Sequence, residues 1–319
     1  MPRLMKALVT GAAGFLGCRV IKALLAGTDG PDVTRIVAAD TVACPIADSH
    51  VDSRTGTIVE PAFIRSVVED DLDVLFHLAA VLSGQSEAEF DLGLQVNVEA
   101  TLTLLNACRR LRRAPRFVFA STVAVFGGEL PEVVPDDCVL RPQSSYGTEK
   151  AIAELLVSEY SRRGFIDGVI CRIATVTVRP GAPNSALSSF VSGIIREPLS
   201  GVDAVCPVPL ETRLWISSPD AVIRNLMHAA HMTASALGGR LAVNLPGLCV
   251  TPAQMLASLE RAGGAAARAH VRCEVDPRVT RVVSTWPGAL DDRRARSLGF
   301  SGDRNFDDVV RQYILQPNG

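Results

Sequence analysis

The feature that most constrains the fold is a glycine-rich turn between a short apolar strand and an amphipathic helix. Residues 6–10 (KALVT) predict the strand, and Gly11, Gly14 and Gly17 follow directly in the sequence TGAAGFLG. Apolar residues then recur at helical spacing up to residue 25. Glycines at such a turn let an anion approach the helix N-terminus and its dipole, because no Cβ atom blocks the way. The pattern predicts a phosphate-binding loop, and a turn that is merely tight is the plainer alternative.

Apolar strands and amphipathic helices alternate through the first half of the chain. Fully apolar strands between helices are typical of a parallel sheet covered on both faces, so the sequence predicts an α/β fold. Further strands are expected at 35–40, 74–77, 116–120 and 168–173, and helices at 93–113 and 145–163. The pattern breaks after about residue 175, and the proline-rich stretch 179–219 predicts irregular structure laid over a site. The last helices are expected at 252–262 and 306–314.

Composition excludes several function classes. The 319 residues carry 32 Lys plus Arg against 34 Asp plus Glu, and this net charge of −2 gives no attraction to nucleic acid or an anionic membrane. The longest near-apolar run, 74–82, is far too short to cross a membrane. The eight cysteines are scattered without a C-x-x-C pair, which favours a reducing, cytoplasmic location. No metal site is expected, because His228 and His231 have no third ligand nearby.

Asp40 ends the second expected strand. A carboxylate at this position of a nucleotide-binding fold accepts hydrogen bonds from an adenosine ribose. The same charge repels a 2′-phosphate, and Thr41 supplies no arginine to hold one. Together with the glycine loop, Asp40 predicts NAD as the cofactor in preference to NADP.

A tyrosine and a lysine stand four residues apart in YGTEK, at the start of an expected helix. Tyr146 and Lys150 therefore lie on one helix face. A phenol acts as a base at neutral pH only if a nearby cation stabilises its phenolate, and Lys150 supplies that charge. Ser121 and Thr122 follow the strand 116–120, at the edge where parallel sheets form sites. The set Thr122, Tyr146 and Lys150 is predicted to remove a proton from a substrate hydroxyl, although the Tyr–Lys spacing alone also arises by chance.

These motifs resemble the extended short-chain dehydrogenase/reductases, the family of NAD-dependent nucleotide-sugar epimerases and dehydratases. The resemblance covers essentially the whole chain and implies a homodimer formed through the helices at 93–113 and 145–163. It also implies a Rossmann-type doubly wound parallel sheet with a smaller C-terminal substrate-binding lobe. The residues that carry it are the loop 10–17, HLAA at 77–80, Asn97, Ser121 with Thr122, and Tyr146 with Lys150. The implied domains are 1–174, to which 217–244 returns, and a lobe from 175–216 and 245–319.

Motifs and resemblance together assign the expected site residues. The NAD contacts are Gly11, Gly14, Phe15, Leu16, Gly17, Asp40, Thr57, Ile58, Leu78, Ala79, Ala80, Asn97, Ser121, Tyr146 and Lys150. The substrate contacts are Ser83, Thr122, Tyr146, Asn184, Ser185 and Arg213.

The chain departs from the family pattern at two positions. Residues 56–58 read GTI where the family usually has an aspartate that contacts adenine, so adenine recognition is expected from Thr57 and the backbone. Val123 and Ala124 follow Thr122 where dehydratases carry an acidic pair, so dehydratase chemistry is not expected.

Longer stretches narrow the expected activity within the family. Residues 82–93, 189–198 and 206–215 resemble a branch that uses NAD to oxidise the C2 hydroxyl of a small sugar acid, D-erythronate, to a 2-oxo acid. Arg213 is then expected to bind the substrate carboxylate through its planar fork, with a structural ion pair to Glu211 or another acid as the alternative. A nucleotide-sugar 4-epimerase that keeps NAD bound, or a non-catalytic NAD-sensing protein, are the alternative functions.

Overall fold

The structure is a computed structural model that describes residues 5–27, 33–181 and 188–315. Contacts divide the chain into two compact units, which are described one at a time. The first unit comprises residues up to Thr122 with 148–172 and 223–243, and the second comprises 123–147, 173–222 and the remainder from Asn244. The sequence places 123–147 with residues 1–174, whereas the contacts group this segment with the second unit.

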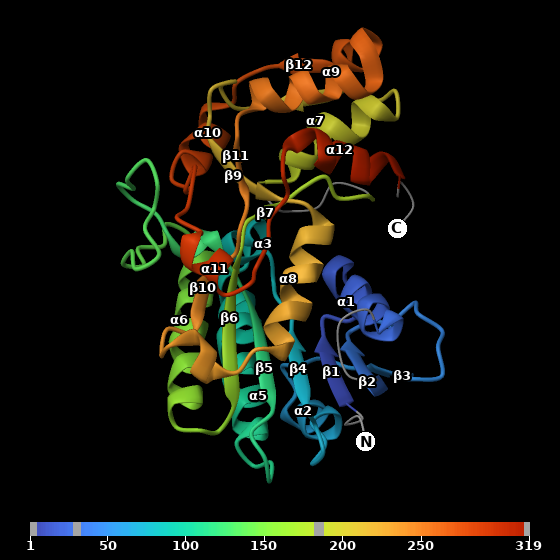
Figure 1. Ribbon diagram of the computed structural model, residues 1–319, viewed down its shortest axis with the longest axis vertical. Helices are drawn as coiled ribbons and strands as arrows, with labels where there is room; N and C mark the ends of the chain where they lie inside the picture. Colours follow the sequence, from blue (N-terminus) through green and yellow to red (C-terminus); the bar gives the residue numbers. More distant parts are fainter. Residues whose placement is uncertain (1–4, 28–32, 182–187, 316–319) are drawn as a thin grey trace. The chain divides into compact units, whose positions relative to one another are not determined.

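A seven-stranded sheet forms the first unit, in the order β10-β6-β5-β4-β1-β2-β3 (Figure 1). Parallel pairing joins β1 to both β2 and β4, β2 to β3, and β4 to β5. The strand order reverses beside β1, which is where doubly wound sheets bind ligands. This topology confirms the expected Rossmann-type fold. The strands are β1 (Met5–Thr10), β2 (Val33–Asp40), β3 (Val51–Thr55), β4 (Val74–His77), β5 (Arg116–Thr122), β6 (Asp167–Ile173) and β10 (Ala242–Asn244).

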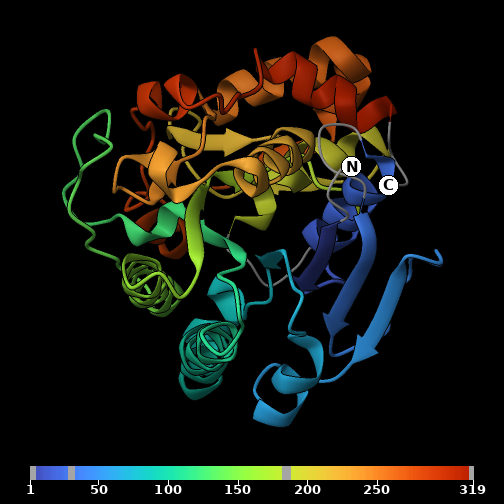
Figure 2. The same cartoon turned by 60° about the horizontal axis from the view of Figure 1, so that its bottom comes forward.

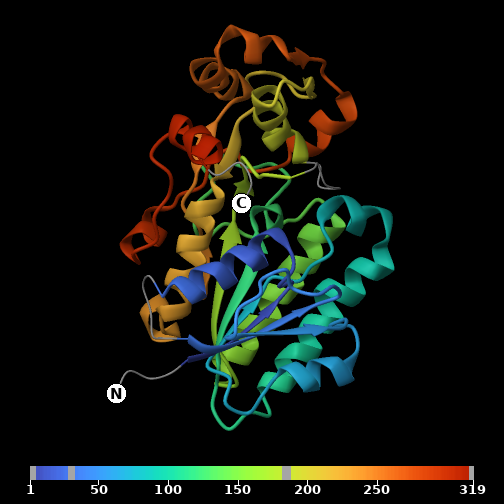
Figure 3. The same cartoon turned by 90° about the vertical axis from the view of Figure 1, so that its right-hand side faces the viewer.

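Helices cover both faces of this sheet. Figure 3 shows α1 (Phe15–Ala26) and α8 (Pro219–His231) on one face, and α5 (Ala100–Cys108) and α6 (Ser145–Arg162) on the other. The last two lie side by side (Figure 2), joined by a hydrogen bond of 2.8 Å from the Tyr160 hydroxyl to Asn106 Oδ1. Apolar side chains of β1, β4 and β5 pack against α5, α6 and the short helix α2 (Pro61–Val67), so the core fixes the strand ends.

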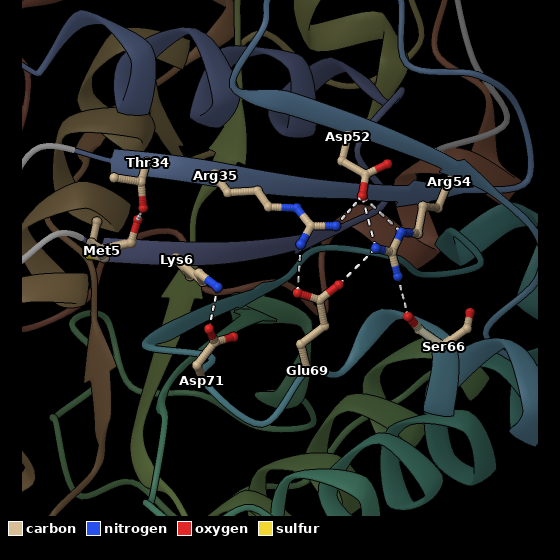
Figure 4. Close-up of polar contacts among 9 residues, drawn as sticks. All are labelled: Met5, Lys6, Thr34, Arg35, Asp52, Arg54, Ser66, Glu69 and Asp71. Carbon is tan, nitrogen blue, oxygen red and sulfur yellow. Dashed lines mark hydrogen bonds and ion pairs between the residues drawn. The ribbon is translucent and has the colours of Figure 1, made fainter.

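Charged side chains rather than apolar burial hold the edge strand β3, which the sequence pattern did not predict. Arg35 on β2 pairs with Asp52 at 2.5 Å and with Glu69 at 2.9 Å. Arg54 on β3 pairs with the same two carboxylates at 2.8 and 2.7 Å (Figure 4). Charged groups on an edge strand also hinder pairing with a foreign sheet.

The prediction of a single helix at 93–113 is wrong in two respects. The segment consists of α4 (Phe90–Leu94), a π-helical turn (Gln95–Glu99) and α5, which ends at Cys108. The π turn gives Asn97 a buried position with several side-chain partners, described below, that a regular helical pattern does not reveal. The four arginines at 109–113 follow the helix and are exposed, and two of them have partners: Arg113 pairs with Asp73 at 2.5 Å and Arg109 lies 4.8 Å from the Phe165 ring centre.

The second unit corrects the expectation of irregular structure at 179–219. This stretch contains α7 (Ser189–Leu199), whose Val191, Ile194 and Ile195 are buried at helical spacing. It also contains β8 (Ala204–Cys206) and β9 (Leu214–Ser217), while 182–187 lie outside the described residues. Prolines usually interrupt helices, so the many prolines of this stretch predicted irregular structure. One of them, Pro198, nevertheless lies inside the last turn of α7.

Two small sheets and several helices complete the second unit. β9 pairs antiparallel with β11 and parallel with β7, and β8 pairs parallel with β12. The remaining elements are β7 (Thr175–Val176), β11 (Leu248–Val250), β12 (Val271–Cys273), α9 (Pro252–Ala269), α10 (Pro277–Val283), α11 (Arg293–Ser297) and α12 (Phe306–Leu315). Within the described residues, no helix is both long and apolar enough to cross a membrane.

Candidate active site

The glycine loop follows β1 and is packed too closely for side chains at two positions. Gly11 has a φ of +70°, and a Cβ there would lie 2.7 Å from the Ala79 nitrogen. A Cβ on Gly17 would lie 2.1 Å from the Gly11 carbonyl oxygen. Gly14 is different, because it is exposed and only the Gly11 oxygen lies near its Cβ position. The loop is therefore closed on its inner side and open at Gly14.

The N-terminus of α1 is available to an anion. The cap residue is Gly14, so no side chain caps the helix. The helix starts at Phe15 and Leu16, and its first turn has no acidic residue. The first amide groups of such a helix point outward at the positive end of its dipole. This arrangement fits the pyrophosphate of a dinucleotide.

Asp40 lies beside this loop at the end of β2. Its Oδ2 accepts a hydrogen bond of 3.0 Å from the Ala13 amide, and its Oδ1 accepts one of 2.6 Å from the Thr41 amide. The carboxylate thus fixes the loop backbone as well as its own position. An acceptor held there suits the ribose hydroxyls expected from the sequence.

A buried histidine links the loop to the helix behind it. His77 Nδ1 lies 2.8 Å from Thr10 Oγ1, and His77 Nε2 lies 2.9 Å from Thr101 Oγ1. Because Thr101 donates to the Asn97 carbonyl, it must accept from Nε2–H, which leaves Nδ1 to accept from Thr10. Burial lowers the pKa of His77 to about 3, so the ring is neutral. His77 therefore has a structural role, joining the end of β1 to α5.

Asn97 in the π turn holds the segment that follows β4. Its Oδ1 accepts from the Val81 amide at 2.9 Å and its Nδ2 donates to the Val81 carbonyl at 3.0 Å. Nδ2 also donates to Glu149 Oε2 at 2.6 Å. The side chain therefore positions the backbone beside the expected cofactor residues Leu78, Ala79 and Ala80.

Lys150 is 2% exposed, and its environment is built for a buried cation. Its Nζ donates to the Ala120 carbonyl at 3.0 Å and lies 4.8 Å from the centre of the Phe119 ring. Burial lowers the pKa of Lys150 to about 8, against the charges of Glu149 and Glu154, which raise it. The two carboxylates thus favour the ammonium form that the expected chemistry needs.

Ser121 belongs to a second buried network. Its hydroxyl donates to Glu154 Oε1 at 2.5 Å, and Arg172 Nη2 pairs with Glu154 Oε2 at 2.7 Å. Both charged side chains are almost fully buried, so each compensates the other. The pair ties α6 to β5 and β6 directly behind the residues that precede Thr122.

The remaining expected residues are distributed between the two units. Thr122 ends β5 and Ser83 begins the short helix α3 (Ser83–Ala88), both in the first unit. Tyr146 is half-buried in the first turn of α6, which carries Lys150 four residues later. Thr57 accepts from the Val59 amide at 3.3 Å, and the Ile58 side chain lies in the core. Asn184 and Ser185 lie outside the described residues.

Arg213 is already engaged within the second unit. Its Nη1 lies 2.8 Å from Glu132 Oε1, and its Nε donates to Cys249 Sγ at 3.3 Å. The Glu132 side chain is 82% exposed, so this ion pair is of the weak surface kind. The ion-pair partner of Arg213 is thus Glu132 and not Glu211. Binding of the substrate carboxylate by Arg213 stays a prediction.

Known proteins match this chain over nearly its full length. A model of the NAD dependent epimerase/dehydratase family matches residues 7–240. The chain belongs to this family. D-erythronate dehydrogenase of Cupriavidus necator is 50% identical over 317 residues, which is 97% of this chain and 98% of that protein. D-erythronate dehydrogenase of Haemophilus influenzae is 43% identical over 97% of this chain and 99% of that protein.

A solved structure agrees with both the fold and the family. The nucleoside-diphosphate-sugar epimerase of Agrobacterium tumefaciens superposes with a TM-score of 0.93 at 37% identity, covering 98% of this chain and 94% of that one. The protein is therefore an NAD-dependent oxidoreductase, and NAD is its cofactor. The open Gly14, the uncapped start of α1 and the fixed Asp40 fit that cofactor on structural grounds. Among the described residues, no group of three or more His, Cys, Asp or Glu side chains suits a metal ion.

Sequence reasoning missed the buried acids of this site. Glu149 and Glu154 flank Lys150 on α6, and Arg172 on β6 neutralises the second of them. A weak signal existed, because both glutamates interrupt the apolar face of the expected helix beside a lysine. Their partners come from other elements, which periodicity within one segment does not reveal.

Proposed function

We propose that this dehydrogenase oxidises the C2 hydroxyl of D-erythronate to 2-dehydro-D-erythronate with NAD. The support for the substrate is the full-length similarity to two proteins named D-erythronate dehydrogenase. One structural observation carries the chemistry, namely the buried ammonium of Lys150 on the helix whose first turn holds Tyr146. A small sugar acid and NAD are then the two small-molecule ligands.

The proposed roles follow from the chemistry of the side chains described above. NAD, when bound, would supply the acceptor for the hydride that leaves C2. Tyr146, as phenolate, takes the hydroxyl proton, and Lys150 supplies the positive charge that favours the phenolate. The Thr122 hydroxyl donates a hydrogen bond to the substrate oxygen. This hydrogen bond holds the oxygen in place while the C2–O bond becomes a carbonyl. Glu149 and Glu154 keep Lys150 cationic in its buried position.

The proposed binding residues divide by element. Gly11, Gly14, Phe15, Leu16 and Gly17 hold the pyrophosphate, and Asp40 holds the adenosine ribose, with Thr57 and Ile58 beside the adenine. Leu78, Ala79, Ala80, Asn97 and Ser121 form or support the wall of the nicotinamide site. Ser83, Asn184, Ser185 and Arg213 remain candidates for the substrate.

A second candidate is a nucleotide-sugar 4-epimerase, which the likeness to the Agrobacterium tumefaciens epimerase favours. The two activities differ in the fate of the cofactor, because an epimerase returns the hydride and releases no NADH. A panel of D-erythronate, other aldonic acids and UDP-glucose, followed by NADH absorbance, separates them. We expect NADH to accumulate in proportion to D-erythronate consumed. Conversion of UDP-glucose to its 4-epimer without NADH release would instead establish the epimerase.

The base is tested by Tyr146→Phe, with Tyr313→Phe on α12 as the matched control. Loss of a general base typically costs about 10²–10⁴-fold in rate, so kcat should fall by that factor while the Kd for NAD stays near the wild-type value. The Tyr313 variant should keep full kcat. A Tyr146→Phe enzyme with normal kcat shows that another group takes the proton.

The molecule is proposed to be a cytoplasmic homodimer. All eight cysteines, each of them a described residue, are free thiols, as suits a reducing compartment. The faces of α5 and α6 expose Leu102, Ile152 and Leu155, the last to 70%. Exposed aliphatic side chains on two adjacent helices suit a self-complementary interface.

A further inference from the structure

One half-buried arginine of the second unit, Arg179, has no counter-ion among the described residues. Arg179 lies between β7 and α7, and its backbone is fixed at both ends: its amide donates to Ser192 Oγ at 3.2 Å, and its carbonyl accepts from Arg196 Nη1 at 2.8 Å. Within the part of the chain that the structure describes, its guanidinium makes no hydrogen bond or ion pair. A cation that is partly removed from water and left unpaired costs free energy.

The charges around Arg179 make that cost larger. Arg196 on α7 is buried, and its positive charge adds to burial in lowering the pKa of Arg179. Arg196 itself is paired, with the adjacent Glu197 at 2.5 Å. Among the described residues Arg196 therefore has a carboxylate partner and Arg179 has none, which leaves the charge of Arg179 uncompensated. A bound anion would neutralise it.

We propose that Arg179 binds the carboxylate of the substrate, with Arg196 as a positioning residue that holds the Arg179 backbone. This inference rests on the proposed function, because a sugar acid supplies the carboxylate. The planar fork of a guanidinium donates hydrogen bonds to both carboxylate oxygens at once, which fixes the acid end of a short substrate. Arg213 is the rival residue, and it differs from Arg179 in already having a carboxylate partner, Glu132.

The test measures D-erythronate binding apart from turnover. Isothermal titration of D-erythronate into the enzyme–NADH complex gives a Kd without chemistry, for the wild type, Arg179→Gln and Arg213→Gln. Arg278→Gln is the control for loss of one positive charge, because its side chain is 90% exposed and pairs with Asp276 two residues away. The KM for NAD and the melting temperature are measured for the same four proteins.

Arg179→Gln should raise the Kd and the KM for D-erythronate about 10- to 100-fold, as expected for a charge-assisted contact. Its KM for NAD should stay within about twofold of the wild type, and the Arg278 variant should match the wild type throughout. The preference for D-erythronate over erythritol, the neutral four-carbon polyol, should fall by the same factor. A carboxylate contact predicts this loss of preference, whereas a purely structural role lowers the melting temperature and leaves the preference intact.

Arg179→Lys covers the case in which the glutamine variant does not fold. Lysine keeps the positive charge but not the planar fork. The Kd for D-erythronate should therefore rise by a smaller factor than in Arg179→Gln. Normal D-erythronate affinity in either Arg179 variant, or a loss confined to Arg213→Gln, overturns the inference while leaving the dehydrogenase function in place. If the wild type itself neither binds nor oxidises D-erythronate, the proposed function fails, and the assignment of Arg179 to its carboxylate fails with it.

Discussion

At the residue scale, the nucleotide loop is shaped by polar side chains that have defined partners. Thr10, His77 and Thr101 form one hydrogen-bonded chain from the end of β1 to the helix behind it. Asp40 makes the other link, from β2 to the Ala13 amide. These side chains determine where backbone groups lie, so a substitution among them changes the site through its geometry as well as through charge.

The charge of Asp40 is predicted to select NAD. Asp40→Asn keeps an acceptor for the Ala13 amide and removes the repulsion of a 2′-phosphate, so kcat/KM for NADP should rise relative to NAD by on the order of tenfold. Asp40→Ala should also reduce the preference for NAD over NADP. Both cofactors should bind more weakly to this variant, because the Ala13 amide loses its hydrogen bond to Asp40. Initial rates with each cofactor check this. A wild type that uses NADP as well as NAD contradicts the role.

At the element scale, the sequence predicted those parts whose stability comes from apolar periodicity within one segment. The strands β1, β4 and β5 and the helices α1 and α6 were predicted within a few residues. β3 was missed because ion pairs with Arg35 and Glu69 hold it. The π turn was missed because Asn97 gains its partners from the segment that follows β4 and from α6. The candidate site shows the same limit, since sequence motifs indicate Tyr146 and Lys150 as candidates but not the acids that surround Lys150.

Helix α6 is predicted to set the basic limit of activity through Glu149. Lys150 is an ammonium below its pKa of about 8 and loses that charge above it. Glu149→Gln removes a carboxylate that favours the ammonium and can keep the hydrogen bonds from Asn97 and Ser86. The basic limb of the pH profile of kcat/KM should therefore move about one unit lower.

Glu159→Gln is the control on the same helix, because Glu159 is exposed and pairs with Arg162. Its pH profile should overlay that of the wild type. An unshifted basic limb in Glu149→Gln means that another group than Lys150 sets the limit, whereas a loss of activity that is equal at every pH indicates a structural role.

At the scale of the whole molecule, the exposed faces of α5 and α6 are predicted to form a dimer. Leu155→Glu places a charge where Leu155 is 70% exposed, so the folded monomer should tolerate it while a dimer interface should not. Sedimentation equilibrium should give a dimer for the wild type and a monomer for the variant, with unchanged circular dichroism. The control is Leu315→Glu on α12, whose side chain is also exposed, at 75%. A monomeric wild type contradicts the proposal.

In the proposed reaction a hydride leaves C2 of D-erythronate for NAD, and isotopic transfer measures this directly. D-erythronate deuterated at C2 should yield NADH that carries the deuterium, with a slower single-turnover rate than the unlabelled acid. D-erythronate deuterated at C3 should yield unlabelled NADH at the normal rate. Deuterium in NADH from the C3-labelled acid, or no NADH from either, would contradict the account.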